Sequence, residues 1–318
     1  MGSVLRNSAL VALWCSLPAI AAGPQIGGCP LFPEDNIWNT AVRDLPVAAR
    51  SADYVHSIGA ELRLHPDFGS GRWGGSDTGI PYVVAKAGQL PVTVKLDVAS
   101  ESDPSPFPIP PRAPIEGDPK PSPRSDRHVL VLDQAQCRLI ELVGAHRLPN
   151  GQWRAGAAAV FPLRSHRLRP AGWTSADAAG LPILPGLVRY EEAATGQIRH
   201  ALRFTAPKTR RAYVWPARHH ASPHNDPQLP AMGQRFRLKA SIRVEGYSLE
   251  ARAILEALRT YGMILADNGG PWFLSGAPDQ RWNNAALQEL KRLRGSDFEA
   301  VDVSGLMVSP DSGRAVRR

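Results

Sequence analysis

Residues 235–243, RFRLKASIR, alternate regularly between apolar and polar or charged side chains. Successive side chains of a β-strand point to opposite faces of a sheet, so the pattern divides this stretch into two faces. One face carries Phe236, Leu238, Ala240 and Ile242, and the other carries Arg235, Arg237, Lys239, Ser241 and Arg243. The stretch therefore predicts a strand with one buried face and one cationic face.

Further runs typical of strands lie upstream, because they are short, apolar and rich in β-branched side chains. They are IPYVVA (80–85), PVTVKLD (91–97), HVLVLD (128–133), CRLIELV (137–143), GAAAVFPL (156–163), LPILPGLVRYEE (181–192), QIRHALRFT (197–205) and RAYVW (211–215). The first two are separated by a glycine turn, which predicts a hairpin or two adjacent strands.

Helical spacing of apolar residues is clearest in the C-terminal part of the chain. Residues 248–261, SLEARAILEALRTY, begin with a serine N-cap and are followed by Gly262, a typical helix end. A second helix is predicted near 283–293, and short strands are predicted at 263–266 and 272–275.

Consecutive strands followed by helices predict a mainly β fold: an antiparallel β-sandwich or jelly-roll-like pair of sheets with a small C-terminal helical layer. An α+β fold is the alternative. A doubly wound parallel sheet is disfavoured, because the middle of the chain lacks the helices that would alternate with its strands.

The composition is that of a globular protein. The chain has 318 residues, 43% of them apolar, and a formal net charge of +8, which is unlike an intrinsically disordered chain. Its 28 glycines and 30 prolines imply many turns and disfavour a helical bundle, and glycine does not recur at every third position as in collagen.

Residues 1–21 predict a secretory signal peptide that is cleaved after Ala21. Arg6 precedes an apolar run over residues 9–22 that is too short for a bilayer span and ends in small residues. A buried N-terminal helix is the alternative, but Pro18 would interrupt it. We expect a secreted protein, extracellular or periplasmic, without a membrane segment after signal removal.

Cleavage would remove Cys15 and leave Cys29 and Cys137, which predicts one disulfide in an oxidising compartment. The alternative is lipid attachment at Cys29, which follows Ile-Gly-Gly but stands apart from the apolar run.

We expect one β-rich domain over residues 22–303 and a flexible tail over 304–318. Residues 102–124 hold nine prolines and form an extended surface segment that is either a long loop or a domain boundary.

Several segments resemble a largely uncharacterised family of secreted microbial proteins. They are FPEDNIWNT (32–40), HPDFGSG (65–71), GWTSADAAGLPILPGLVRY (172–190), IRHALRFT (198–205), RRAYVWPARH (210–219) and YGMILADNG (261–269). The resemblance spans nearly the whole chain after the signal peptide and implies neither a reaction nor catalytic residues. The sequence has no G-x-S-x-G, Walker, H-E-x-x-H or C-x-x-C motif.

Three aspartates are candidate catalytic residues: Asp67, Asp177 and Asp267. Each lies in a loop-like segment near an aromatic residue, and two carboxyl groups at a fixed separation can supply the acid and the base or nucleophile of glycoside hydrolysis. The tryptophans nearby, predicted to bind substrate, are Trp73, Trp173 and Trp272. The alternative is that these aspartates stabilise turns through backbone hydrogen bonds.

The segment ARHHASPHND contains Arg218 and His219, and His219 is a candidate general base. The histidine spacing matches no standard zinc site, so we expect no metal. His200 lies on an apolar strand face, which favours a hydrogen-bonded core histidine over a catalytic one. Glu141 shares a strand face with apolar residues, so it either points into a cleft or indicates a different register.

Residues 199–243 hold ten lysines and arginines against one acid, Asp226. Arginines on neighbouring strands would form a cationic face suited to carboxylate, sulfate or phosphate groups. The candidate substrate-binding arginines are Arg199, Arg218, Arg235 and Arg237. A solvated sheet surface without a ligand is the alternative.

These patterns favour a secreted carbohydrate-active enzyme, specifically a glycoside hydrolase that acts on a cell-wall or extracellular polysaccharide. One alternative is a polysaccharide lyase, in which Arg218 neutralises a uronate and His219 or Tyr213 removes a proton. Another is a non-catalytic glycan-binding protein. We expect a monomer without a cofactor whose partner is a polysaccharide, with an acidic polymer as one option, rather than nucleic acid or membrane.

Overall fold

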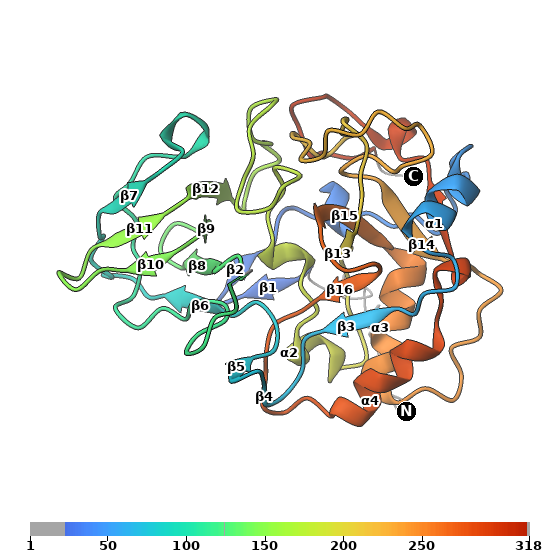
Figure 1. Cartoon of the computed structure of the whole chain (residues 1–318), viewed down its shortest axis with the longest axis horizontal. Helices are drawn as coiled ribbons and strands as arrows, with labels where there is room; N and C mark the ends of the chain where they lie inside the picture. Colours follow the sequence, from blue (N-terminus) through green and yellow to red (C-terminus); the bar gives the residue numbers. More distant parts are fainter. Residues whose placement is uncertain (1–22, 124, 317–318) are drawn as a thin grey trace, which may run out of the picture.

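The computed structural model describes residues 23–123 and 125–316, so the predicted signal peptide lies outside the described residues. Figure 1 shows smaller sheets on one side of the molecule and a larger sheet, accompanied by helices, on the other. None of the helices in the described part of the chain has the length and apolar character needed to cross a bilayer.

Strands are more numerous than helices. The strands are β1 (Gln25–Ile26), β2 (Cys29–Pro30), β3 (His65–Asp67), β4 (Arg72–Trp73), β5 (Ser76–Asp77), β6 (Tyr82–Ala85), β7 (Val94–Leu96), β8 (Val129–Asp133), β9 (Arg138–Val143), β10 (His146–Arg147), β11 (Trp153–Ala155), β12 (Ala157–Pro162), β13 (Leu202–Ala206), β14 (Arg235–Leu238), β15 (Met263–Asn268), β16 (Phe273–Ser275) and β17 (Phe298–Val301). The α-helices are α1 (Ser51–Ile58), α2 (Tyr190–Ala193), α3 (Leu249–Thr260) and α4 (Asn284–Glu289). The short 3-10 helices are η1 (Ile37–Asn39), η2 (Ala99–Glu101), η3 (Leu184–Gly186), η4 (Leu290–Arg292), η5 (Gly295–Asp297) and η6 (Ser304–Leu306). The predicted mainly β, sandwich-like fold with a small helical part is confirmed.

The larger sheet has the strand order β17-β14-β15-β13-β16-β3. The pairs β13/β15 and β16/β3 are parallel and the others antiparallel, so the sheet is mixed. Phe204, Phe236, Trp272 and Phe298 form a cluster of aromatic contacts, with ring centroids 5.4 to 5.7 Å apart. Helix α3 packs against β14 and α1 against β17.

The second sheet has the order β12-β9-β8-β6, and its strand β8 is buried on both faces, which explains the continuous apolar run of β8. Leu130 and Leu132 join the main core, whereas Val129 and Val131 join a smaller cluster. The proline-rich segment supplies that smaller cluster with Phe107, Ile109, Ala113 and Ile115. This segment therefore covers the sheet as extended chain.

Arg235 and Arg237 point away from Phe236, as the alternation predicts, but the face that they occupy is buried. They are only 1% and 9% exposed, because the N-terminal segment lies over them. Arg237 Nη1 donates to the carbonyl oxygens of Val42, Arg43 and Leu45 at 2.8 Å. The predicted cationic surface is therefore wrong for these two arginines, which hold the N-terminal segment in place.

The predicted disulfide between Cys29 and Cys137 is confirmed, with a Cα–Cα distance of 5.3 Å. The C-terminal segment differs from the predicted flexible tail, since hydrogen bonds hold residues 304–316 against the body of the protein. Gly313 N donates to the His166 carbonyl at 2.6 Å, and Ala315 N donates to the Asp35 carbonyl at 2.7 Å.

Some predicted strands have a different structure. Residues 181–192 form η3 and α2, because Pro182 and Pro185 cannot donate to a ladder. Residues 80–85 and 91–97 contain β6 and β7, but these do not form a hairpin: β6 pairs with β8 and β7 with β11, each in parallel.

Candidate active site

Strand register on the larger sheet places a row of polar side chains on the face opposite Phe204. Arg203 and Thr205 flank Phe204 in β13 and therefore point to this other face. A register shift between Phe204 and Thr205 brings Asp267 of β15, rather than Ala266, opposite Thr205. The bulge thereby puts the Asp267 carboxyl on the polar face.

Strands β16 and β3 extend this polar row. Ser275 is the register partner of Asp67, and Phe273 is the partner of His65. Arg203 Nη1 donates to Ser275 Oγ at 2.6 Å. The His65 ring stacks on Phe273 with centroids 4.1 Å apart. Asp67 and Asp267 therefore share one floor, with Arg203 between their strands.

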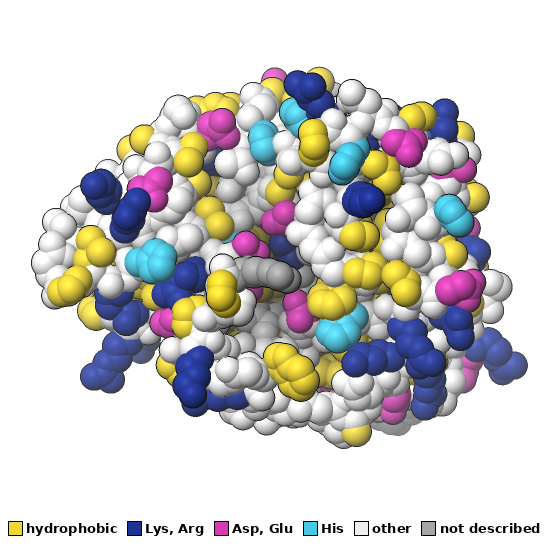
Figure 2. All heavy atoms as spheres, in the orientation of Figure 1, with side chains coloured by type: hydrophobic (Ala, Val, Ile, Leu, Met, Phe, Trp, Pro, Cys, Tyr) yellow, Lys and Arg dark blue, Asp and Glu magenta, His cyan; other side chains and the backbone are white. Residues whose placement is uncertain are grey.

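A cleft of about 650 Å³ lies over this floor. Its walls come from the loop 73–80, from residues 116–122 of the proline-rich stretch and from residues 125–128, which precede β8. Asp67, Asp267 and Trp73 line it, so two of the three predicted aspartates and one predicted tryptophan belong to a single cleft. Figure 2 shows acidic side chains gathered around a hollow near the centre of this face.

Asp177, the third predicted aspartate, is completely buried and does not line the cleft. Its two carboxylate oxygens accept hydrogen bonds from Arg203 Nε and Nη2, each at 2.8 Å. This bidentate pair is the strong geometry for arginine and carboxylate. Asp177 therefore neutralises Arg203 beneath the floor rather than meeting a ligand.

Asp267 lies beside this pair. Its Oδ2 is 3.7 Å from Arg203 Nη2 and accepts a hydrogen bond from Ala178 N at 3.4 Å. Burial raises the pKa of the Asp267 carboxyl, and the negative charge of Asp177 raises it further, to about 7. Asp267 is thus partly protonated near neutral pH while lining the cleft.

Glu116 faces the same cleft and is paired with His128. His128 Nδ1 lies 2.6 Å from Glu116 Oε2, and His128 Nε2 lies 3.0 Å from the Ala176 carbonyl oxygen. A carbonyl only accepts, so Nε2 donates to Ala176 and Nδ1 donates to Glu116. This is the pattern of a charged imidazolium.

The pKa shifts of this pair follow from that geometry. Burial disfavours the charged imidazole of His128, but the Glu116 carboxylate outweighs burial and raises the pKa of His128 to about 9. Burial likewise disfavours the Glu116 carboxylate, but the His128 charge and hydrogen bonds hold its pKa below the ordinary value. Glu116 therefore stays ionised and fixed in the cleft wall.

Asp67 is open to the cleft at the other end of the floor. Partial enclosure by the walls raises the pKa of its carboxyl, with His65 opposing the shift and Glu116 adding to it. The cleft thus combines one carboxylate with a lowered pKa and two carboxyl groups with raised values.

The three predicted tryptophans lie in three different places. Trp73 is 84% exposed and lines the cleft. Trp173 lines a separate hollow and packs against Arg169, whose guanidinium carbon is 5.5 Å from the ring centroid. Trp272 is completely buried in the core, where it cannot reach a ligand.

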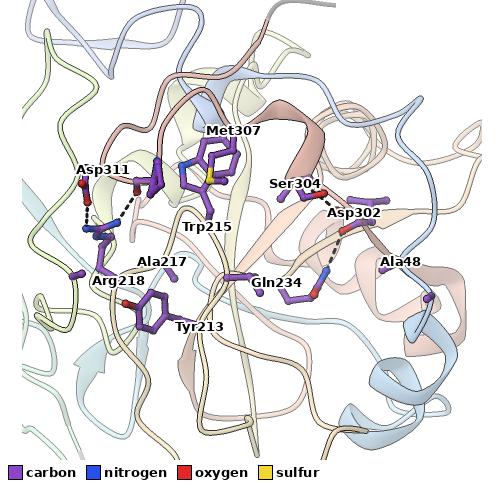
Figure 3. Close-up of a pocket in the computed structure, with 16 residues that line it drawn as sticks. Ala48, Tyr213, Trp215, Ala217, Arg218, Gln234, Asp302, Ser304, Met307 and Asp311 are labelled. Atoms are coloured by element: carbon purple, nitrogen blue, oxygen red, sulfur yellow. Dashed lines mark hydrogen bonds and ion pairs between the residues drawn. The ribbon is translucent and has the colours of Figure 1, made fainter.

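Arg218 is buried outside the cleft, as Figure 3 shows beside Tyr213 and Asp311. Its Nε donates to the Arg169 carbonyl at 2.7 Å, Nη1 donates to the Pro310 carbonyl at 2.6 Å, and Nη2 pairs with Asp311 at 2.5 Å. All three nitrogens are occupied, so Arg218 links three segments of the chain.

His219 and Arg199 do not line the cleft either. His219 Nδ1 lies 2.9 Å from the carbonyl oxygen of Ala178, the residue whose backbone N–H donates to Asp267. Arg199 is partly exposed and donates from Nη2 to Gln197 Oε1 at 2.7 Å.

Glu141 and His200 are both fully buried. Glu141 accepts hydrogen bonds from the backbone N–H groups of Ile183 and Leu184 at the start of η3, and burial raises the pKa of its carboxyl to about 7. His200 Nε2 lies 3.0 Å from Glu192 Oε2, as expected of a hydrogen-bonded core histidine.

Within residues 23–123 and 125–316, no cluster of three metal-ligating side chains occurs.

The sequence analysis did not identify Glu116 or His128, and it considered Arg203 only as part of a cationic sheet face. Glu116 lies among prolines, and His128 opens an apolar strand, so neither stands in a pattern typical of a site. The inward position of Arg203 could have been predicted, because Arg203 alternates with Leu202 and Phe204 on a strand whose partner carries Asp267.

Searches of protein-family models, curated proteins and solved structures find no match to this chain.

Proposed function

We propose that this protein is a secreted carbohydrate-active hydrolase that cleaves a glycosidic bond in the cleft between Asp267 and Glu116. The observation that carries the proposal is the opposite direction of the two pKa shifts. The pKa of Asp267 is raised to about 7, and that of Glu116 is held below its ordinary value. Acid and base roles of two carboxyl groups are set by such contrasting environments.

In the proposed reaction, Asp267 donates its proton to the glycosidic oxygen as the bond to the anomeric carbon breaks. The Glu116 carboxylate either removes a proton from the attacking water or attacks the anomeric carbon itself, after which water releases the sugar. Water supplies a hydroxyl group to one product and a proton to the other. The reaction requires no metal or redox cofactor.

Glu116 is better suited than Asp67 to act with Asp267. Asp67 and Asp267 lie on strands separated by β16 and β13. Three strand spacings of about 4.8 Å put their backbones about 14 Å apart, whereas glycosidase carboxyl groups are about 5 to 9.5 Å apart. Glu116 comes from the opposite wall, and its charge acts on Arg203, which lies next to Asp267. We assign Asp67 to substrate binding at the far end of the floor.

Trp73 supports a sugar ligand. Among residues 23–123 and 125–316 it is the most exposed large apolar side chain, and it lines the cleft. A flat aromatic face stacks well on the apolar face of a sugar ring, and its exposure costs the free protein hydrophobic stabilisation. The lyase alternative loses support, because every guanidinium nitrogen of Arg218 is already bound within the protein.

A polysaccharide panel tests this proposal. The protein without residues 1–21 is incubated with neutral, acidic and amino-substituted polysaccharides, and product masses are measured. Products heavier by one water per bond cleaved support hydrolysis. Unsaturated products without added water would indicate a lyase, and binding without product would indicate a glycan-binding protein.

A further inference from the structure

A second pocket, of about 520 Å³, shares no lining residue with the cleft. It lies between the segment 213–218 and the C-terminal segment 301–311, as Figure 3 shows. Pockets of this volume are typical of small-molecule sites. We call it the Tyr213–Met307 pocket after two residues that line it.

The lining of the Tyr213–Met307 pocket is mostly apolar. Its apolar side chains include Val214, Trp215, Ala217, Val301, Val303 and Met307. Tyr213 is 37% exposed and Met307 39%, so both leave apolar surface in contact with water. A ligand that covers this surface gains hydrophobic stabilisation.

The walls of this pocket are fixed by hydrogen bonds. Trp215 Nε1 donates to the Ser312 carbonyl at 2.8 Å, and Arg218 Nη1 donates to the Pro310 carbonyl at 2.6 Å. These bonds tie the segment 213–218 to the C-terminal segment. The pocket is therefore formed before a ligand binds, which lowers the entropy cost of binding.

The charges around this pocket select an uncharged ligand. Arg218 and Asp311 neutralise each other at one end, with Nη2 and Oδ1 2.5 Å apart. Asp302, also in the lining, is exposed, and its Oδ1 accepts a hydrogen bond from Ser304 N. The Asp302 carboxylate repels an anion, and its attraction for a cation is screened because Asp302 is exposed to solvent, so neither charge recovers the hydration that it would lose in the pocket.

Gln234 supplies one specific polar group. Its side chain is mostly buried, and Nε2 donates to the carbonyl oxygens of Arg235 at 3.2 Å and Val301 at 3.0 Å. Two carbonyl acceptors fix the orientation of the amide. Among residues 23–123 and 125–316, no donor binds Gln234 Oε1, which leaves an acceptor at the pocket without a partner.

We propose that the Tyr213–Met307 pocket binds an uncharged small molecule with an aromatic or alicyclic body and one hydroxyl or N–H group that donates to Gln234 Oε1. The apolar body covers Trp215 and Met307. This inference does not depend on the hydrolase function of the cleft.

Calorimetry with two matched probes tests the proposal. 2-Naphthol has the required donor, and 2-methoxynaphthalene has the same ring system without it. We expect 2-naphthol to bind the full protein one to one and 2-methoxynaphthalene to bind about fivefold to tenfold more weakly, the effect of one neutral hydrogen bond. Asp267→Asn should leave both affinities unchanged, since Asp267 lies in the cleft.

Two lysine variants complete the test. Met307→Lys introduces a charge at the pocket and should weaken 2-naphthol binding at least tenfold. Val308→Lys is the matched control, because Val308 is 52% exposed on the same segment but does not line the pocket. Equal affinity for the two probes, absence of one-to-one binding, or unchanged binding after Met307→Lys would overturn the proposal.

Discussion

The guanidinium of Arg203 binds both carboxylate oxygens of Asp177 at 2.8 Å; Arg203 lines the floor of the cleft, and the fully buried Asp177 lies behind it. The bound charge of Asp177 in turn contributes to the raised pKa of Asp267 on the cleft floor. Burial and the Asp177 charge thus raise the pKa of the proposed acid, and the charge of Arg203 partly opposes them.

Asp177→Asn should destabilise the protein strongly, because it removes the bidentate partner of the buried Arg203 and leaves only the longer contact with Asp267 at 3.7 Å. We expect the free energy of unfolding to fall by about 3 to 5 kcal/mol, measured by urea denaturation. Asp77→Asn is the control. Asp77 forms an exposed pair with Arg72 at 3.2 Å, so its loss should change stability by less than about 1 kcal/mol. Equal losses in the two variants would contradict this role for Asp177.

The His128–Glu116 pair should make stability depend on pH. The pKa of His128 is raised to about 9 in the folded protein, above its ordinary value of 6.5. The contribution of the ion pair is therefore complete below pH 6.5 and lost as the pH rises through about 9. The stability difference between the wild type and His128→Gln should narrow over this range. A constant difference would show that the imidazole is not preferentially charged in the fold.

Trp73→Ala should weaken polysaccharide binding without lowering the melting temperature. Loss of one stacking platform predicts an affinity about threefold to tenfold lower. Leu90→Ala is the matched control, because Leu90 is 77% exposed and does not line the cleft. Affinity measurements in which both variants bind like the wild type would remove Trp73 from the site.

The sequence predicted the mainly β fold because strand periodicity is local information. It also predicted the alternation of Arg235 with Phe236 correctly. The prediction that Arg235 is exposed was wrong, because the segment that buries this strand face lies about 200 residues earlier in the chain. The same limit applies to Glu116, because only the tertiary fold brings this residue of the proline-rich segment into one cleft with Asp267.

The site residues show a similar division. Asp67 and Asp267 were identified from their turn-like, aromatic surroundings, and they share one cleft. Asp177 has the same local pattern but turns inward to Arg203, and Trp272 turns into the core. Local sequence identifies polar and aromatic positions, whereas strand register and tertiary packing decide which of them reach a common surface.

Replacing Cys29 and Cys137 by serine should destabilise the protein. The disulfide joins residues separated by 108 positions, and in the chain-entropy model a loop of that length stabilises the fold by about 4 to 5 kcal/mol. Denaturation of the protein without residues 1–21 measures this loss. Its thiol titration under denaturing conditions should detect no free thiol, and two free thiols would contradict the bridge.

The most direct test of the account is the kcat/KM of Asp267→Asn and Glu116→Gln on the polysaccharide that the wild type cleaves, with product formation followed in ¹⁸O-labelled water. We expect the wild type to incorporate one ¹⁸O per bond cleaved and each variant to lose a factor of about 10² to 10⁴. Asp67→Asn should act mainly on KM, and Asp97→Asn, which removes an exposed carboxylate outside the cleft, should match the wild type. Near wild-type kcat/KM in Asp267→Asn, or products without ¹⁸O, would contradict hydrolysis in this cleft.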